Sequence, residues 1–212
     1  GKIVAPKYFK NQSPSGKITA NDKPKIEDSR ITQLEGFPKY LEGTIIFCHQ
    51  DNLNTDGIFP GKYTYIDDFT PEQQAEVVME NYDPEFAHLV SKGDILVGGY
   101  NFGTGSSREQ AATSLKYQGI QVVLAGSFSQ TYKRNAINNG FLILEAPDLV
   151  NDLKDLFGLQ KLTEKTNMNA KIDFSLSVIN INNKEYPLPP VGIAAQEIII
   201  AGGLENWVKE KI

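Results

Sequence analysis

Apolar and polar segments alternate between Tyr40 and Leu144 in a pattern typical of strands and helices in turn. Four apolar runs have strand length and are rich in Ile, Val, Leu and Phe: Leu41–Cys48, Asp94–Gly98, Ile120–Ala125 and Phe141–Leu144. Runs that are apolar throughout are typical of strands buried on both faces of a sheet. The pattern therefore predicts an α/β fold with a mainly parallel central sheet and flanking helices.

Helices are predicted between these strands. Their expected ranges are Pro71–Asn81, Ser107–Gln118 and Ser129–Asn139. Thr70 is the expected N-cap of the first helix, and Gly119 and Gly140 are expected to end the other two. The strand–helix–strand–helix–strand order from Asp94 to Leu144 predicts parallel pairing through right-handed crossovers.

Beyond Pro147 the pattern changes to alternation and turns. The expected elements are an amphipathic helix over 149–157, a strand with one buried face over Ala170–Ile179, a turn at Asn182-Asn183, a strand over 184–188 and a terminal helix over 204–212. The segment Ala194–Ala201 fits helix and strand equally well. We predict that this β-rich C-terminal part packs on the parallel unit.

The first 38 residues differ from the rest of the chain. Pro6–Arg30 is rich in Lys, Ser, Asn, Asp and Pro and has no helical or strand period. The chain starts at Gly1, and its first methionine is Met79. We therefore expect residues 1–38 to tether one domain, residues 39–212, to an upstream region of a longer polypeptide, with a frayed terminus as the alternative.

Composition excludes several classes of function. The net charge of −5 and the pI near 5.1 argue against nucleic acid as the main partner. No apolar run approaches the ~20 residues needed to cross a bilayer, and no signal peptide is visible. Cys48, His49 and His88 are too few to build a zinc or iron–sulfur site by themselves.

The loop from Gly98 to Gln110 carries the strongest chemical signal. It follows a predicted buried strand and precedes a predicted helix, and it contains Gly103, Gly105, two serines and Arg108. Glycines allow close backbone approach to a ligand, helix N-termini attract anions, and arginine binds carboxylates through two parallel hydrogen bonds. A capping box, with Ser106 as the N-cap and Glu109 reaching back, explains part of the pattern but not its glycines or its arginine. The loop matches neither a P-loop nor a dinucleotide-binding fingerprint.

Two further polar loops follow apolar strands, at Asp51–Tyr65 and Ser127–Asn139. Asx turns and helix caps account for many of their polar residues. Because ligands gather at the carboxyl ends of strands in α/β sheets, we expect all three loops to meet at one crevice.

At these loops the sequence resembles the aconitase superfamily. Tyr100–Ala111 is similar to the family's G-x-G-S-S-R-E-[HQ]-A signature, and Asn54–Pro60 to its N-x-D-x-I-x-P element. Ser127–Ser129 with Asn135 is similar to its S-F-x-x-x-x-x-x-N element. The three motifs occur in family order. The resemblance implies that residues 39–212 form a swivel domain, which is the small subunit in two-chain members.

The resemblance also implies site roles. Ser106 would be the catalytic base, as an alkoxide, and Ser107, Arg108 and Gly105 would bind the substrate carboxylate. A [4Fe–4S] cluster would act as a Lewis acid on the leaving hydroxyl. No metal ligand is expected in this chain, because the cluster's cysteine ligands belong to the family's other domains. Those domains and a small tricarboxylate substrate are the implied partners.

Within the superfamily the same segments look most like the fungal homoaconitase branch. That branch reversibly hydrates homoaconitate to homoisocitrate in the mitochondrial matrix, in lysine biosynthesis through α-aminoadipate. An isopropylmalate isomerase-type small subunit and a non-catalytic carboxylate-binding module are the alternatives, and the acidic pI disfavours an RNA-binding role.

The sequence departs from the aconitase pattern in two places. Gln110 stands where aconitase itself has histidine. Aconitase also has a substrate-binding arginine in the loop after the N-x-D-x-I element, and here no arginine follows Asp56 before Arg108. The segment Lys62, Tyr63, Thr64 and Tyr65 is the expected specificity loop.

Overall fold

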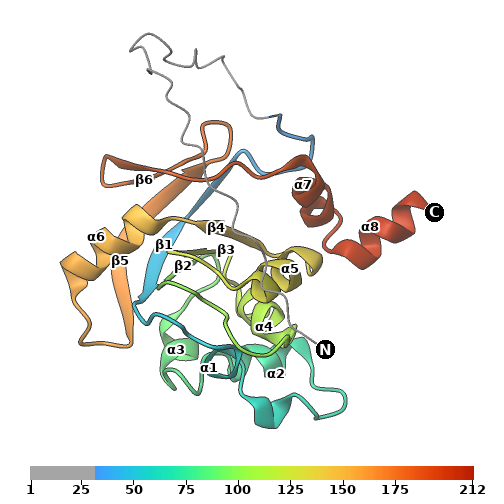
Figure 1. Cartoon of the computed structure of the whole chain (residues 1–212), viewed down its shortest axis with the longest axis horizontal. Helices are drawn as coiled ribbons and strands as arrows, with labels where there is room; N and C mark the ends of the chain where they lie inside the picture. The colour runs from blue at the N-terminus through green and yellow to red at the C-terminus, as the bar shows by residue number, and fades with distance from the viewer. Residues whose placement is uncertain (1–31) are drawn as a thin grey trace, which may run out of the picture.

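The computed structural model describes residues 32–212, and the expected linker at Pro6–Arg30 lies outside them. A seven-stranded sheet runs through the described part in the order β4-β3-β2-β1-β5-β6-β7. Its strands are β1 (Tyr40–Cys48), β2 (Ile95–Gly98), β3 (Val122–Ala125), β4 (Leu142–Glu145), β5 (Thr163–Asp173), β6 (Val178–Ile181) and β7 (Lys184–Pro187). Figure 1 shows the sheet with helices on both sides.

The helices of the described residues are short. They are α1 (Thr55–Ile58), a 3₁₀ turn (Gly61–Tyr63), α2 (Pro71–Glu76), α3 (Phe86–Leu89), α4 (Gln110–Gln118), α5 (Gln130–Asn138), α6 (Pro147–Phe157), α7 (Ile193–Ile200) and α8 (Leu204–Lys211). Within residues 32–212, no helix combines the length and the apolar character that a membrane span requires.

The strands β1 to β4 form the predicted parallel unit. Successive side chains of these strands point to opposite faces of the sheet, and helices cover both faces. Ile46 and Cys48 of β1 face a core that α1, α3, α4 and α5 cover, while Ile45 and Phe47 face a second core that α6 covers. Burial on both sides explains why these strands are apolar throughout.

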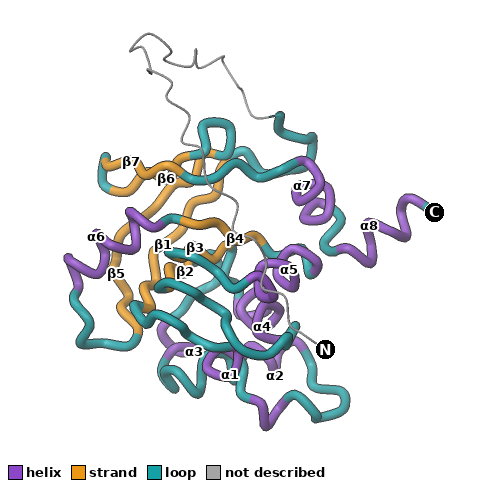
Figure 2. The backbone as a smooth tube through the Cα atoms, viewed as in Figure 1, coloured by secondary structure: helices purple, strands orange, loops and turns teal. Residues whose placement is uncertain are grey.

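The C-terminal strands extend the same sheet. β5 pairs antiparallel with β1, and β6 and β7 follow as antiparallel hairpins (Figure 2). Asn182 and Asn183 make the predicted turn, both with positive φ, as a two-residue hairpin turn requires. The predicted β-rich part is therefore present, but it continues the same sheet by pairing with β1 and does not pack on the parallel unit as a separate layer.

The single strand predicted over Ala170–Ile179 is wrong, because a turn divides it. Asp173 pairs with Val178 across the β5–β6 hairpin. Asp173 Oδ1 accepts hydrogen bonds from the backbone N–H of Ser175, at 2.9 Å, and of Leu176, at 3.1 Å. A carboxylate that satisfies local amides in this way favours a turn over a continuing strand.

The predicted C-terminal end of the first helix also moves. Thr70 and Gln73 form a capping box that starts α2, but the helix ends at Glu76 and not at Asn81. Met79 has a φ of 62°, and its N–H donates to the Ile58 carbonyl at 2.7 Å, so a tertiary contact draws the chain out of the helix. The ambiguous segment 194–201 is helical, as α7.

Candidate functional site

The carboxyl ends of three parallel strands lie level with one another. Cys48 of β1 pairs with Gly98 of β2, which pairs with Ala125 of β3. The three polar loops of the sequence therefore leave the sheet from one edge.

Backbone hydrogen bonds hold these loops together. Asn52 N–H donates to the Tyr100 carbonyl at 2.7 Å, and Thr55 N–H donates to the Thr104 carbonyl at 2.8 Å. Phe102 N–H donates to the Ser127 carbonyl at 2.9 Å, which joins the third loop to the first two. The three loops therefore meet at one end of the strands, as predicted, but only the first two line the cavity described below.

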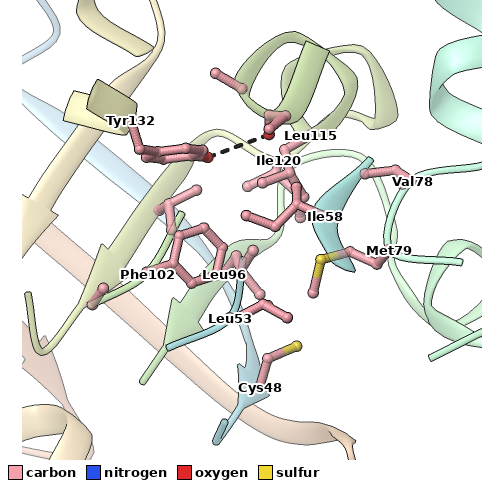
Figure 3. Close-up of a cluster of buried hydrophobic side chains, with 14 of the residues drawn as sticks. Cys48, Leu53, Ile58, Val78, Met79, Leu96, Phe102, Leu115, Ile120 and Tyr132 are labelled. Carbon is pink, nitrogen blue, oxygen red and sulfur yellow. Dashed lines mark hydrogen bonds between the residues drawn. The ribbon is translucent and has the colours of Figure 1, made fainter. Parts of the chain in front are cut away.

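The glycine-rich loop depends on Gly103 for its path. Gly103 has a φ of 72°, and a Cβ there would lie 2.3 Å from the Tyr132 ring. The rings of Phe102 and Tyr132 pack edge to face, with their centroids 5.3 Å apart. Figure 3 shows the two side chains next to each other in the buried cluster. Tyr132 also stacks on Phe128 at 5.9 Å. The aromatic cluster fixes the loop from below, and only glycine leaves room for the ring.

Ser106 and its neighbours line a cavity of about 460 Å³. The lining residues are Thr64, Tyr65, Ser106, Ser107, Arg108, Glu109 and Gln110. Ser106 is exposed on the cavity side, and its Oγ lies 2.9 Å from Thr55 Oγ1. A larger groove of about 600 Å³, around Gly43 and Gly93, lies at the other end of the strands and holds none of the predicted site residues.

The capping-box alternative for Ser106 and Glu109 is wrong. Helix α4 starts at Gln110, and its N-cap, Glu109, makes no side-chain capping bond. Ser106, Ser107 and Arg108 therefore precede the helix that was expected to begin at Ser107. The backbone N–H groups of Ser106 to Gln110 donate to no described residue, and all five residues line the cavity. Unpaired amides just before and at a helix N-terminus are a typical anion-binding arrangement.

Arg108 is fixed by a carboxylate of the second loop. Its Nη1 donates to Asp56 Oδ1 at 2.7 Å and to the Phe59 carbonyl at 3.0 Å. The hydrogen bond from Arg108, and then the one from Gly61 N–H, hold the pKa of Asp56 below its usual value. Nη2 and Nε of Arg108 donate to no described residue, so part of the guanidinium remains available beside the cavity.

The expected specificity segment divides in two. Lys62 pairs with Glu80 at 2.6 Å, and the Tyr63 hydroxyl donates to the same carboxylate at 2.9 Å. Thr64 and Tyr65 line the cavity, with Tyr65 91% exposed. Only the second half of the segment borders the space in front of Ser106.

The third motif supports the loop from behind. Asn135 is buried and donates to the Ser107 carbonyl at 3.0 Å, and the Ser129 hydroxyl donates to the Gly103 carbonyl at 2.6 Å. Ser127 Oγ accepts from Asn101 N–H at 2.8 Å. These side chains hold the loop and do not line the cavity.

Sequence reasoning missed Thr55. This residue is 3% exposed, and Ser106 is the one described residue to which its hydroxyl is hydrogen-bonded. Its place inside the second motif, between Asn54 and Asp56, was the available signal. Interpreting this loop as Asx turns considered only neighbouring residues. The hydrogen bond to Ser106 could not be foreseen in that way, because it joins residues that are 51 positions apart.

The described residues do not fit an iron–sulfur cluster. Cys48 is fully buried, and burial raises the pKa of its thiol to about 12, which opposes the thiolate that a cluster needs. Within residues 32–212, no three His, Cys, Asp or Glu side chains are grouped to hold a metal ion.

Comparison with known proteins agrees with this geometry. The aconitase C-terminal domain matches residues 16–149. The homoaconitase, mitochondrial, of Mycosarcoma maydis is 51% identical over 84% of this chain and 29% of its own length. That of Candida parapsilosis is 45% identical over 87% of this chain and 28% of its own length.

The fold has a solved counterpart. The 3-isopropylmalate dehydratase of Methanocaldococcus jannaschii superposes with a TM-score of 0.67 at 35% identity, over 81% of this chain and 95% of its own. The present chain thus spans almost a whole chain of that dehydratase but 28–29% of the two homoaconitases. The sequence match, the α/β swivel-type fold and the clustered motifs lead to one conclusion: the chain belongs to the aconitase family, as its C-terminal, swivel-type domain.

Proposed function

We propose that this chain is the swivel domain of a hydro-lyase that reversibly hydrates homoaconitate to homoisocitrate in lysine biosynthesis. The observation that carries the proposal is Ser106, exposed on a cavity beside Arg108 and a row of free backbone N–H groups. The 51% identity to a homoaconitase supports the choice of substrate. The mitochondrial names of the relatives support a place in the mitochondrial matrix.

In this proposal Ser106 acts as the base. Its Oγ takes the proton from the carbon next to a substrate carboxylate during dehydration and returns a proton during hydration. Arg108, Ser107 and the backbone at Gly105 bind that carboxylate equally in the ground state and in the transition state, so their loss acts mainly on KM. The φ of 97° at Gly105 turns the chain so that Ser106 follows at the cavity rim.

The remaining parts of the site are proposed to come from other domains. Residues 1–38 are the proposed tether and residues 39–212 the swivel domain. Because the described residues do not fit a [4Fe–4S] cluster, we assign the cluster to N-terminal domains of the same polypeptide. The partners are those domains and a small tricarboxylate.

The function is tested with the complete polypeptide that contains this chain, reconstituted with iron and sulfide. We expect hydration of homoaconitate, followed through the loss of the ultraviolet absorbance of its double bond. The 212-residue chain alone is expected to be colourless and inactive, because it lacks the cluster ligands. Complete polypeptide that holds the cluster and still fails to hydrate homoaconitate would contradict the proposal.

A second candidate is an isopropylmalate isomerase, which the 35% identity to a 3-isopropylmalate dehydratase favours. The two substrates differ in the side chain that the enzyme must accept, and Thr64 and Tyr65 are the proposed specificity residues on this side of the cavity. Assays with both unsaturated acids separate the candidates, and a polypeptide that binds them without turnover would be the carboxylate-binding module.

The Arg108→Lys variant of the complete enzyme is expected to raise KM about 10- to 100-fold, with a smaller effect on kcat. Lysine keeps the charge, but a single ammonium lacks the fork that holds Asp56, Phe59 and a carboxylate at once. Steady-state kinetics give the result. The matched control is Arg134→Lys, at an exposed arginine of α5 that does not line the cavity, and an equal KM in the two variants would remove Arg108 from the site.

A further inference from the structure

We infer that Thr55 is a positioning residue for the proposed base: its hydroxyl orients Ser106 Oγ and stabilises the oxygen after deprotonation. The inference rests on the proposed function of Ser106. It comes from one juxtaposition, a buried threonine hydroxyl 2.9 Å from an exposed serine hydroxyl at a cavity.

The surroundings fix the position of Thr55. Its backbone N–H donates to the Thr104 carbonyl at 2.8 Å, so α1 is attached to the loop that carries Ser106. Asn54 caps α1 by accepting from Gly57 N–H at 2.7 Å. A Cβ at Gly105 would lie 3.5 Å from Thr55 Oγ1, which shows how closely the loop passes over this hydroxyl.

The direction of the hydrogen bond follows from chemistry. An alkoxide at Ser106 has no proton to give, so it only accepts. Thr55 Oγ1 is hydrogen-bonded to no other described residue, so its proton is available for Ser106. Before proton transfer, the Thr55 hydroxyl donates a hydrogen bond to the Ser106 alkoxide. After Ser106 has taken the proton from substrate, the same bond joins two neutral hydroxyls, and either of them can be the donor. A bond that is stronger to the anion lowers the pKa of the serine.

The base also needs a fixed direction. An exposed serine side chain rotates among three staggered positions, and a bond to a buried partner selects one of them. Thr55 is held by backbone contacts on α1, and Ser106 is held by a loop that packs on Tyr132 through Gly103. The hydrogen bond therefore aims Ser106 from a rigid support, which a catalytic group requires.

The test uses the complete, cluster-containing enzyme and the variants Thr55→Val, Thr55→Ser and Thr113→Val. Valine keeps the shape of threonine and removes the hydroxyl, and serine keeps the hydroxyl. Thr113→Val is the matched control, because Thr113 donates a comparable bond to Gln74 at 3.0 Å and lies outside the cavity lining. Melting temperatures and cluster absorbance identify folded, loaded variants, and Thr55→Ala replaces Thr55→Val if the latter does not fold.

We expect Thr55→Val to lower kcat about 10- to 100-fold, the effect of losing a hydrogen bond to a charged group, with KM changed less than about twofold. The pH profile is measured in the dehydration direction, in which Ser106 must be deprotonated to accept the proton. There the kcat of Thr55→Val should continue to rise with pH beyond the point where the wild type levels off, because the pKa of Ser106 is then higher. Thr55→Ser should retain most of the wild-type kcat and its pH profile.

Other results would overturn the inference. A wild-type kcat and pH profile in Thr55→Val would show that the hydroxyl does nothing for Ser106, as would an equal loss in Thr55→Ser or in Thr113→Val. A wild-type enzyme that does not hydrate homoaconitate would instead contradict the proposed function, so the two failures are distinguishable.

Discussion

The Ser106→Ala variant of the complete enzyme is expected to lose about 10³-fold or more in kcat while its KM stays within a few-fold of the wild type. In the proposed mechanism the hydroxyl acts on the proton in the transition state, whereas ground-state binding is assigned to Arg108 and the backbone N–H groups of the residues that line the cavity. The measurement is steady-state hydration of homoaconitate by protein with equal cluster content.

Ser107→Ala is the matched control for this loss. Ser107 is the neighbouring exposed serine on the same cavity, and Asn135 holds its carbonyl, so the substitution leaves the loop anchored. We expect Ser107→Ala to raise KM more than it lowers kcat. Equal losses of kcat and affinity in Ser106→Ala would assign Ser106 to binding alone, and a larger kcat loss in Ser107→Ala would exchange the two roles.

The Gly103→Ala variant is expected to lose about 3 kcal/mol or more of unfolding free energy, from steric overlap and backbone strain together. Gly103 has a φ of 72°, and the added Cβ would lie 2.3 Å from the Tyr132 ring. Tyr132 cannot move aside easily, because it packs on Phe102 and stacks on Phe128. Urea unfolding of the 212-residue chain measures the change.

Gly202→Ala separates the two contributions. Gly202 has a φ of 78°, so alanine there carries a similar left-handed strain, but its Cβ would meet only Asn206, at an ordinary 3.7 Å. We expect a loss of about 1 kcal/mol from this variant. If Gly103→Ala cost no more than Gly202→Ala, the aromatic cluster would not be what holds the loop.

Each of the three loops contributes different contacts to the candidate site, so the site contains residues from distant parts of the sequence. The first loop presents Ser106 and Arg108, the second supplies Thr55 and Asp56 as their partners, and the third anchors the first through Asn135. Strand register makes this possible, since Cys48, Gly98 and Ala125 end at one level. A side chain that belongs to one loop can therefore hydrogen-bond to a candidate site residue of another loop.

The sequence by itself determined the parts of this protein that depend on local preference and burial. Apolar runs specified the strands of the parallel unit, and glycines marked the ends of α4 and α5. The spacing of Ser106, Ser107 and Arg108 matches the aconitase-type loop, and its anion-binding role stays a prediction. These features were predictable because each depends on residues that are close together in the chain.

Only the tertiary structure decided the partners of the site residues and several boundaries. Thr55 meets Ser106 across 51 residues, and Asp56 meets Arg108 across 52. Such contacts follow from the alignment of strands, which no local pattern encodes. Two helix boundaries also depend on distant contacts. Helix α2 ends at Glu76, shortly before the Met79 N–H donates to the Ile58 carbonyl. Helix α4 starts only at Gln110, and the segment before it is bonded to Asp56 and Asn135. Helix propensity is worth tenths of a kcal/mol per residue, and tertiary hydrogen bonds and packing of about 1 kcal/mol or more each override it.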